Sequence, residues 1–267
     1  MIRISDHEFG QFQRFIFDAA GIALSDAKKA LVSGRLAKRL HACDVKNYGD
    51  YFRLLMSGES PLELQTAIDL LTTNETYFFR EPKHFQFLKE QIAGSTLPGP
   101  GMRIWSAAGS TGEEAYSIAM LLEDCLPGVS WEVVASDISA RVLERARAGH
   151  YSMERLSLFP PGYLQRFCLK GRDAQAGTML VQRSLRDKVR FLQVNLNAAL
   201  PQLGKFDVIF LRNVLIYFNM ETKRKVVSRV LNVLKPGGYL FIGHSESLIE
   251  VTGAVELVAP AIYRMMA

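Results

Sequence analysis

Apolar residues recur at intervals of three or four positions along the N-terminal part of the chain, which is the spacing of helices that bury one face. The first stripe contains Phe9, Phe12 and Ile16. The same spacing predicts further helices after a cap at Ser25 or Asp26 and then at about 47–56 and 61–71. Residues 1–72 are therefore expected to form an all-helical domain.

The pattern changes in residues 73–267, where short apolar runs alternate with amphipathic helical stretches. Strands that alternate with helices predict a parallel, doubly wound sheet. Residues 163–187 interrupt this alternation and predict a β-hairpin inserted into the α/β domain. The predicted strands include "RIWS", "WEVVAS", "KVRFLQV", "KFDVIFL" and "GYLFIG", with a final strand pair near the C-terminus.

Composition narrows the class of protein without defining it. The chain has 267 residues, 48% of them hydrophobic, and contains no apolar run of the ~20 residues that span a bilayer. The N-terminus lacks the apolar core of a secretory signal. The three cysteines stand far apart, which argues against a zinc site or a disulfide framework. A cytoplasmic protein without a metal is expected.

The formal net charge of +5 comes mostly from residues 28–41, which contain no Asp or Glu. Such a run usually marks a solvated helix face, but it also suits docking on an acidic partner. DNA binding is less attractive, since no recognition-helix turn and no interleaved aromatic residues accompany the charges. The residues that can share one broad helix face are Lys28, Arg35, Lys38 and Arg39.

Polar turns follow the predicted strands at the edge where α/β sheets bind ligands. The turn "SAAGSTGEE" at 106–114 matches neither a dinucleotide fingerprint nor a P-loop, and its two acids, Glu113 and Glu114, suit a ligand with a cationic centre. Asp137 ends the next strand, where an acid accepts ribose hydroxyls; the alternative is a helix N-cap, for which Ser139 competes.

Two later turns complete this set. Asn195 offers an amide that could recognise an adenine edge, and Arg212, Asn213 and Tyr217 follow a fully apolar strand. Together the turns indicate a nucleoside pocket without a phosphate cradle, which points to S-adenosylmethionine as the ligand.

Five segments carry a resemblance to a known family: "TTNETYFFRE", "RIWSAAGSTGEEAYSIAM", "ASDIS", "LRNVLIYF" and "LKPGGYLFIGHSE". They resemble the signature segments of the chemotaxis receptor methyltransferases, the CheR family, and the similarity runs essentially end to end. It implies a Rossmann-like class I methyltransferase fold behind a helical bundle, and methyl transfer from S-adenosylmethionine to chemoreceptor glutamates, which leaves S-adenosylhomocysteine. In the family the residue at the position of Gly109 varies.

The resemblance also implies site residues. Cofactor contacts are expected from Asn74, Thr76, Arg80, Glu113, Asp137, Asn195, Leu196, Asn213 and Val214. The basic helix is expected to dock on the acidic methylation region of the receptors. In some family members the inserted hairpin binds a receptor C-terminal peptide by strand addition; here a purely structural hairpin remains an equal alternative.

The expected chemistry explains the absence of an evident general base. A glutamate carboxylate, with an ordinary pKa of about 4.3, is already ionised near neutral pH. A guanidinium can hold it through two N–H bonds, so Arg80 is the expected acceptor-binding residue, with Tyr217 as a second donor. The five histidines are scattered, and a solvated or structural role is expected for His244.

The segment "TTNETYFFRE" itself has two interpretations. Thr72 and Glu75 fit a capping box, which would make the stretch a short helical hinge. Its place before the first strand instead favours a lid over the cofactor, with Phe78 and Phe79 as buried support.

Two rival functions stay open: a methyltransferase with a different acceptor, and a nucleoside-sensing or nucleic-acid-binding module without turnover. In the favoured interpretation the protein is a monomer that binds no nucleic acid and does not insert into a membrane.

Overall fold

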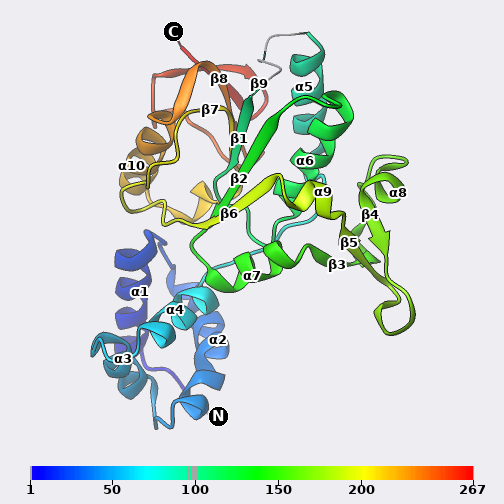
Figure 1. Ribbon diagram of the computed structural model, residues 1–267. Helices are drawn as coiled ribbons and strands as arrows, with labels where there is room; N and C mark the ends of the chain where they lie inside the picture. Colours follow the sequence, from blue (N-terminus) through cyan, green and yellow to red (C-terminus); the bar gives the residue numbers. More distant parts are fainter. Residues whose placement is uncertain (1, 95–96, 98–100, 267) are drawn as a thin grey trace. The chain divides into compact units, whose positions relative to one another are not determined.

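The computed structural model describes residues 2–94, 97 and 101–266. It divides into two compact units. The first runs from the N-terminus to Thr73 and includes Tyr217–Lys223; the second comprises Asn74–Ile216 and the chain from Arg224 onward. Figure 1 labels the elements of both.

Helices α1 (Asp6–Ala20), α2 (Lys29–Ala42), α3 (Tyr48–Met56) and α4 (Pro61–Leu71) form the first unit, which confirms the predicted bundle. Phe12 lies at its centre, stacked 6.2 Å from the ring of Tyr51. The predicted cap of α2 is wrong: a 3₁₀ turn, η1 (Asp26–Lys28), precedes that helix, and Ser25 makes no side-chain capping bond.

Residues far along the chain complete the first unit. Ile22 forms an antiparallel bridge with Phe218, and the N–H of Ala23 donates to the carbonyl of Tyr217 at 2.8 Å. These pairings join the residues after α1 to the end of the polar turn that was predicted after the strand "KFDVIFL".

Seven strands of the described residues form the sheet of the second unit. The order is β6 (Val189–Gln193), β2 (Trp131–Asp137), β1 (Met102–Ser106), β7 (Phe206–Leu211), β8 (Leu234–Ile242), β10 (Ile262–Met265), β9 (Val255–Ala259). The first five run parallel, and β10 runs antiparallel to both of its neighbours, β8 and β9. The predicted mostly parallel fold is confirmed. Its chain order reverses at β1, so the ligand-binding edge is expected beyond β1, β2 and β7.

The core explains why these strands are buried. Every residue of β7 is buried, and the rings of Phe210 and Phe241 stack 4.5 Å apart on neighbouring strands. The main helices of this unit are α5 (Pro82–Ala93), α6 (Glu113–Cys125) and α7 (Ala140–Ala148); α10 (Met220–Leu231) begins in the segment assigned to the first unit.

The predicted Pro-Gly-Gly turn is wrong. Pro236, Gly237 and Gly238 lie within β8, and Val208 pairs with Tyr239 although Phe206 pairs with Leu234. The extra residues form an irregularity in the strand, as bulges do.

The predicted hairpin is present but incomplete. Its strands β4 (Cys168–Lys170) and β5 (Thr178–Val181) pair antiparallel, and β3 (His150–Ser152) pairs with the other side of β5. Residues 163–167 were expected as strand but form the short helix α8, because Tyr163 and Phe167, four positions apart, bury the same face. The remaining short elements of this region are η2 (Met153–Arg155), η3 (Asp173–Gln175) and α9 (Arg183–Arg186).

Among the residues that the structure describes, no helix is long and apolar enough to cross a membrane.

Candidate functional site

Asp137 lies buried at the carboxyl end of β2, where both of its carboxylate oxygens accept backbone hydrogen bonds. Oδ2 accepts from the N–H of Ser110 at 3.0 Å, and Oδ1 accepts from the N–H of Ser139 at 2.9 Å. Ser139 takes the N-cap of α7, with its side chain accepting from Val142. The capping alternative for Asp137 is therefore not realised.

The turn after β1 brings the backbone close to its neighbours. Gly112 has φ of +95° at the N-terminus of α6, and a Cβ there would lie 2.9 Å from both the Ala146 Cβ and the Tyr151 hydroxyl. The next residue, Glu113, accepts from the Thr111 hydroxyl at 2.6 Å. Two predicted cofactor residues share a pocket here, which is lined by Thr76, Tyr77, Phe78, Glu113, Tyr151, Ser152 and Glu154.

The segment before α5 is extended, and no helix begins at Thr72, so the capping-box interpretation is wrong. The carbonyl of Asn74 accepts from the Ser110 hydroxyl at 3.0 Å, which joins this segment to the turn after β1. Phe78 and Phe79 are buried, as expected of supporting side chains. The N–H of Phe79 donates to the Ser117 hydroxyl at 2.9 Å.

Arg80 follows these rings. Its Nη1 donates to the carbonyl of Glu75 at 3.0 Å, and its guanidinium lies 5.6 Å from the centroid of the Tyr77 ring. The side chain is therefore folded along its own segment. Tyr217, its expected partner in acceptor binding, belongs to the first unit, so the pairing of the two stays a prediction.

The other predicted cofactor residues follow β6 and β7. Asn195 accepts from the N–H of Asn197 through Oδ1 at 2.9 Å, and Leu196 is buried. Asn213 has φ of +56° and donates its N–H to Glu246 Oε2 at 2.9 Å; Val214 comes next. Since parallel strands end at one edge of a sheet, these residues and Asp137 lie along the same edge.

A buried ion-pair network surrounds Arg212, which the sequence pattern indicated only as a polar residue after an apolar strand. Arg212 is 5% exposed. Its Nη2 lies 3.2 Å from Glu81 Oε2, and its Nη1 lies 3.2 Å from Glu114 Oε2. Burial raises the pKa of Glu114, and Arg212 opposes this. Burial also acts to raise the pKa of Glu81, but Arg212, together with smaller contributions from His244 and His84, outweighs it and the pKa is lowered.

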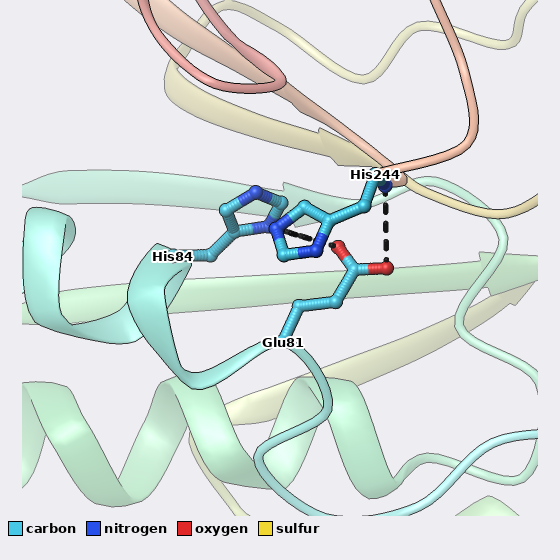
Figure 2. Close-up of side chains that lie close together, drawn as sticks. All are labelled: Glu81, His84 and His244. Carbon is cyan, nitrogen blue, oxygen red and sulfur yellow. Dashed lines mark hydrogen bonds and ion pairs between the residues drawn. The ribbon is translucent and has the colours of Figure 1, made fainter.

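Two of the histidines expected to be scattered lie together beside this network (Figure 2). The rings of His84 and His244 are 4.9 Å apart, and His84 Nδ1 lies 3.3 Å from Glu81 Oε2. Burial, with a smaller contribution from Arg212, lowers the pKa of His84 to about 4, so its imidazole is neutral near pH 7.

This trio offers ligand atoms within 4.8 Å of one another, a spacing that could hold a metal ion. However, the Arg212 guanidinium faces the same Glu81 oxygen at 3.2 Å. A dication there would share its carboxylate with a fixed cation, so the donor set suits an ion-pair network better than a metal centre.

In the basic helix of the first unit, the two arginines expected to dock on the receptor form bonds within that unit. Arg35 donates to the carbonyls of Leu71 and Thr72 at 3.1 and 3.0 Å. Arg39 forms a bidentate pair with Glu63, and hydrogen bonding to that carboxylate raises the pKa of Arg39. The two lysines, Lys28 and Lys38, are exposed.

An α/β sheet with acids and amides beyond its strand ends is typical of the class of proteins that bind a nucleoside ligand at that edge. The chain belongs to the CheR methyltransferase family. Residues 74–263 match that family's S-adenosylmethionine-binding domain, and residues 7–72 match its all-alpha domain.

Curated relatives extend over nearly the whole chain. A "chemotaxis protein methyltransferase" of Escherichia coli K12 is 40% identical over 99% of this chain and 92% of its own length. A protein of the same name from Klebsiella aerogenes is 42% identical over 97% of this chain and 90% of its own length. "Chemotaxis protein methyltransferase 2" of Pseudomonas aeruginosa is 39% identical over 96% and 92% respectively.

Proposed function

We propose that this protein transfers the methyl group of S-adenosylmethionine to glutamate carboxylates of chemoreceptors and thereby supports sensory adaptation. The observation that carries the proposal is the match of two CheR domains, over residues 7–72 and 74–263, together with relatives named for chemotaxis protein methylation. In this proposal residues 1–72 act as a helical domain and residues 73–267 as the catalytic domain.

The polar groups at the sheet edge fit this cofactor. S-adenosylmethionine, when bound, supplies an electrophilic methyl group on a cationic sulfur. The Asp137 carboxylate, buried at the end of β2, is proposed to accept hydrogen bonds from the ribose hydroxyls, and Glu113 at the turn offers a negative charge to an amino group. Further contacts are proposed from Asn74, Thr76, Arg80, Asn195, Leu196, Asn213 and Val214. No metal is part of the proposed mechanism.

The acceptor requires orientation and not deprotonation. A receptor glutamate is ionised near pH 7, so the protein must hold one carboxylate in line with the methyl group and exclude water. Arg80 is proposed to bind that carboxylate through two N–H groups, which leaves a lone pair for attack. Tyr217 is proposed as a second donor that fixes its orientation.

Docking is proposed to involve the exposed part of the basic helix. Lys28 and Lys38 are free of the internal bonds that Arg35 and Arg39 make, so they contribute more to an acidic receptor surface than the two arginines. Strand β4 lies at the edge of the small sheet and offers a place for a receptor peptide by strand addition; a structural hairpin remains the alternative. The protein is proposed to act as a cytoplasmic monomer.

The test incubates the protein with methyl-labelled S-adenosylmethionine and acidic cytoplasmic fragments of chemoreceptors. Methyl esters release methanol in mild base, whereas N-methyl groups do not. Base-labile label on the receptor is expected. Base-stable label would mean that the methyl acceptor is not a carboxylate. Cofactor binding without any labelled receptor would favour a nucleoside sensor.

A further inference from the structure

We infer that Arg212 is a positioning residue that fixes the direction in which Arg80 leaves the chain. This inference deepens the proposed function and rests on it for the role of Arg80. It is carried by a set of contacts that join three segments of the second unit: the turn at 79–81, the first turn of α6 and the end of β7.

The first contact is to the backbone of the turn. Arg212 Nη2 donates to the carbonyl of Arg80 at 2.5 Å, so it holds the peptide unit that carries the proposed acceptor-binding side chain. The same guanidinium pairs with Glu81, the next residue, at 3.2 Å. Arg212 therefore contacts both residues of one peptide bond: the carbonyl of Arg80 and the side chain of Glu81.

The turn needs such a restraint because its backbone is unusual. Phe79 has φ of +55° and Glu81 has φ of +59°, a conformation that residues with a Cβ adopt only when their surroundings enforce it. The Phe79 N–H to Ser117 bond holds one end, and the Arg212 contacts hold the other. Without Arg212, the residues that flank Arg80 are free to relax to ordinary dihedral angles.

The carboxylate of Glu114 links the turn at 79–81 to the cofactor side of the site. Glu114 accepts from the Ser106 hydroxyl at 2.7 Å and pairs with Arg212 Nη1 at 3.2 Å. Glu114 adjoins Glu113, which lines the proposed cofactor pocket. A planar guanidinium can face two carboxylates and a carbonyl at once, whereas a lysine ammonium is a single point and cannot span them.

The histidines complete the enclosure of Glu81. His84 is fully buried beside the carboxylate, and the half-exposed His244 places Nε2 3.8 Å from Glu81 Oε2 (Figure 2). Because His84 is neutral, Arg212 supplies the charge that balances Glu81 inside the protein. The turn, its ion pair and the proposed acceptor residue thus form one rigid group.

The experiment compares Arg212→Lys, Arg80→Ala and the double variant, with Arg190→Lys as the matched control. Arg190 makes a surface pair with Glu132. Arg212→Lys keeps the positive charge between the two buried carboxylates, so the variant is expected to fold, which a thermal melt checks. The turnover number for methyl transfer is expected to fall about 10- to 100-fold, the size of loss that a displacement of ~1 Å produces.

A second measurement distinguishes the positioning of Arg80 from a purely structural role of Arg212. Binding of S-adenosylhomocysteine, measured by calorimetry, is expected to weaken in Arg212→Lys and in Arg80→Ala, and the double variant should bind no more weakly than Arg80→Ala. Amide hydrogen exchange of residues 78–81 should accelerate in Arg212→Lys and not in Arg190→Lys. Additive binding losses, or unchanged exchange in Arg212→Lys, would overturn the inference.

The two proposals fail separately. If the unaltered protein methylates no receptor fragment, the proposed function is wrong, whereas the binding cycle and the exchange measurement still decide whether Arg212 positions Arg80.

Discussion

The backbone N–H of Ser110 donates a 3.0 Å hydrogen bond to Oδ2 of Asp137. This bond joins the turn after β1 to the end of β2, and the Ser110 hydroxyl binds the carbonyl of Asn74 in turn. Three segments that are separate in the sequence are therefore linked through Ser110 beside the carboxylate where the nucleoside part of the cofactor is proposed to bind.

Replacement of Asp137 with Asn should weaken binding of S-adenosylhomocysteine by about 10- to 100-fold, because an amide loses a charged acceptor for hydroxyl donors. Calorimetric titration measures the affinity. The same substitution at exposed Asp187 is the control and should change nothing. Equal affinity of Asp137→Asn and the unaltered protein would remove Asp137 from the cofactor site.

Arg80→Ala should abolish methyl transfer while leaving the second unit folded, because its side chain makes contacts only with its own segment among those described above. Arg80→Lys should restore little activity, since an ammonium cannot bind a carboxylate through a planar fork. Label transfer and thermal melts together separate lost chemistry from lost folding. Full turnover by the alanine variant would contradict the proposed mechanism.

The two glycines of the turn after β1 should respond differently to alanine. At Gly112 the positive φ and the contacts with Ala146 and Tyr151 predict a loss of about 2–4 kcal/mol in unfolding free energy. At Gly109 the φ angle is not positive, and a Cβ meets chiefly the Ser106 hydroxyl at 2.9 Å; turning that hydroxyl away gives up its bond to Glu114, so a smaller loss of about 1–2 kcal/mol is expected. Urea denaturation measures both. Comparable losses would refute the difference drawn between the two positions.

The Arg39–Glu63 pair predicts acid sensitivity in the first unit. Burial acts to raise the pKa of Glu63, but hydrogen bonds from Arg39 and Tyr51 outweigh it and the pKa lies below its ordinary value of 4.5. Its contribution to stability is thus present above pH 4.5 and is lost as the pH falls through the lowered pKa.

Glu63→Gln should accordingly destabilise the protein by about 1–3 kcal/mol at pH 7, and by progressively less below pH 4.5. Denaturation midpoints at pH 7, 5 and 3.5 measure this change. Glu59→Gln, at an exposed position, should show no such convergence. A Glu63→Gln effect that stays constant over this range would argue against the pair as its cause.

Charge reversal at Lys28 and Lys38 should raise KM for receptor fragments by about tenfold or more at low salt and leave the turnover number nearly unchanged, because screened surface charges act on encounter and docking. Lys46→Glu, an exposed lysine of the same unit, is the control. An equal rise in KM for Lys46→Glu would mean that the net charge of the protein, and not a docking surface at Lys28 and Lys38, decides binding.

The alternation of apolar runs and helices was enough to predict the sheet, because strands buried on both faces leave an unmistakable pattern, as in β7. Short elements were missed for the opposite reason. Strand β3 spans His150–Ser152, which is too few residues to show a period, and its place in a sheet depends on pairing with Thr178–Leu180.

The Arg212 network marks a different limit. Its partners Arg80, Glu81 and Glu114 are each ordinary in their local sequence, and only folding brings them to one guanidinium. The count of charges in residues 28–41 likewise could not show that Glu63 neutralises Arg39. Motifs predicted which residues bear chemistry, and the folded structure showed which of them bond to other residues of the chain.

The bridge between Ile22 and Phe218 bears on how the protein is made. Ribosomes release the N-terminal helices first, yet part of their backbone pairing waits until Tyr217 and Phe218 have emerged. A recombinant fragment that stops at Thr73 would leave Ile22 and Ala23 without these partners. The helical unit is therefore the first to be synthesised and among the last to be completed.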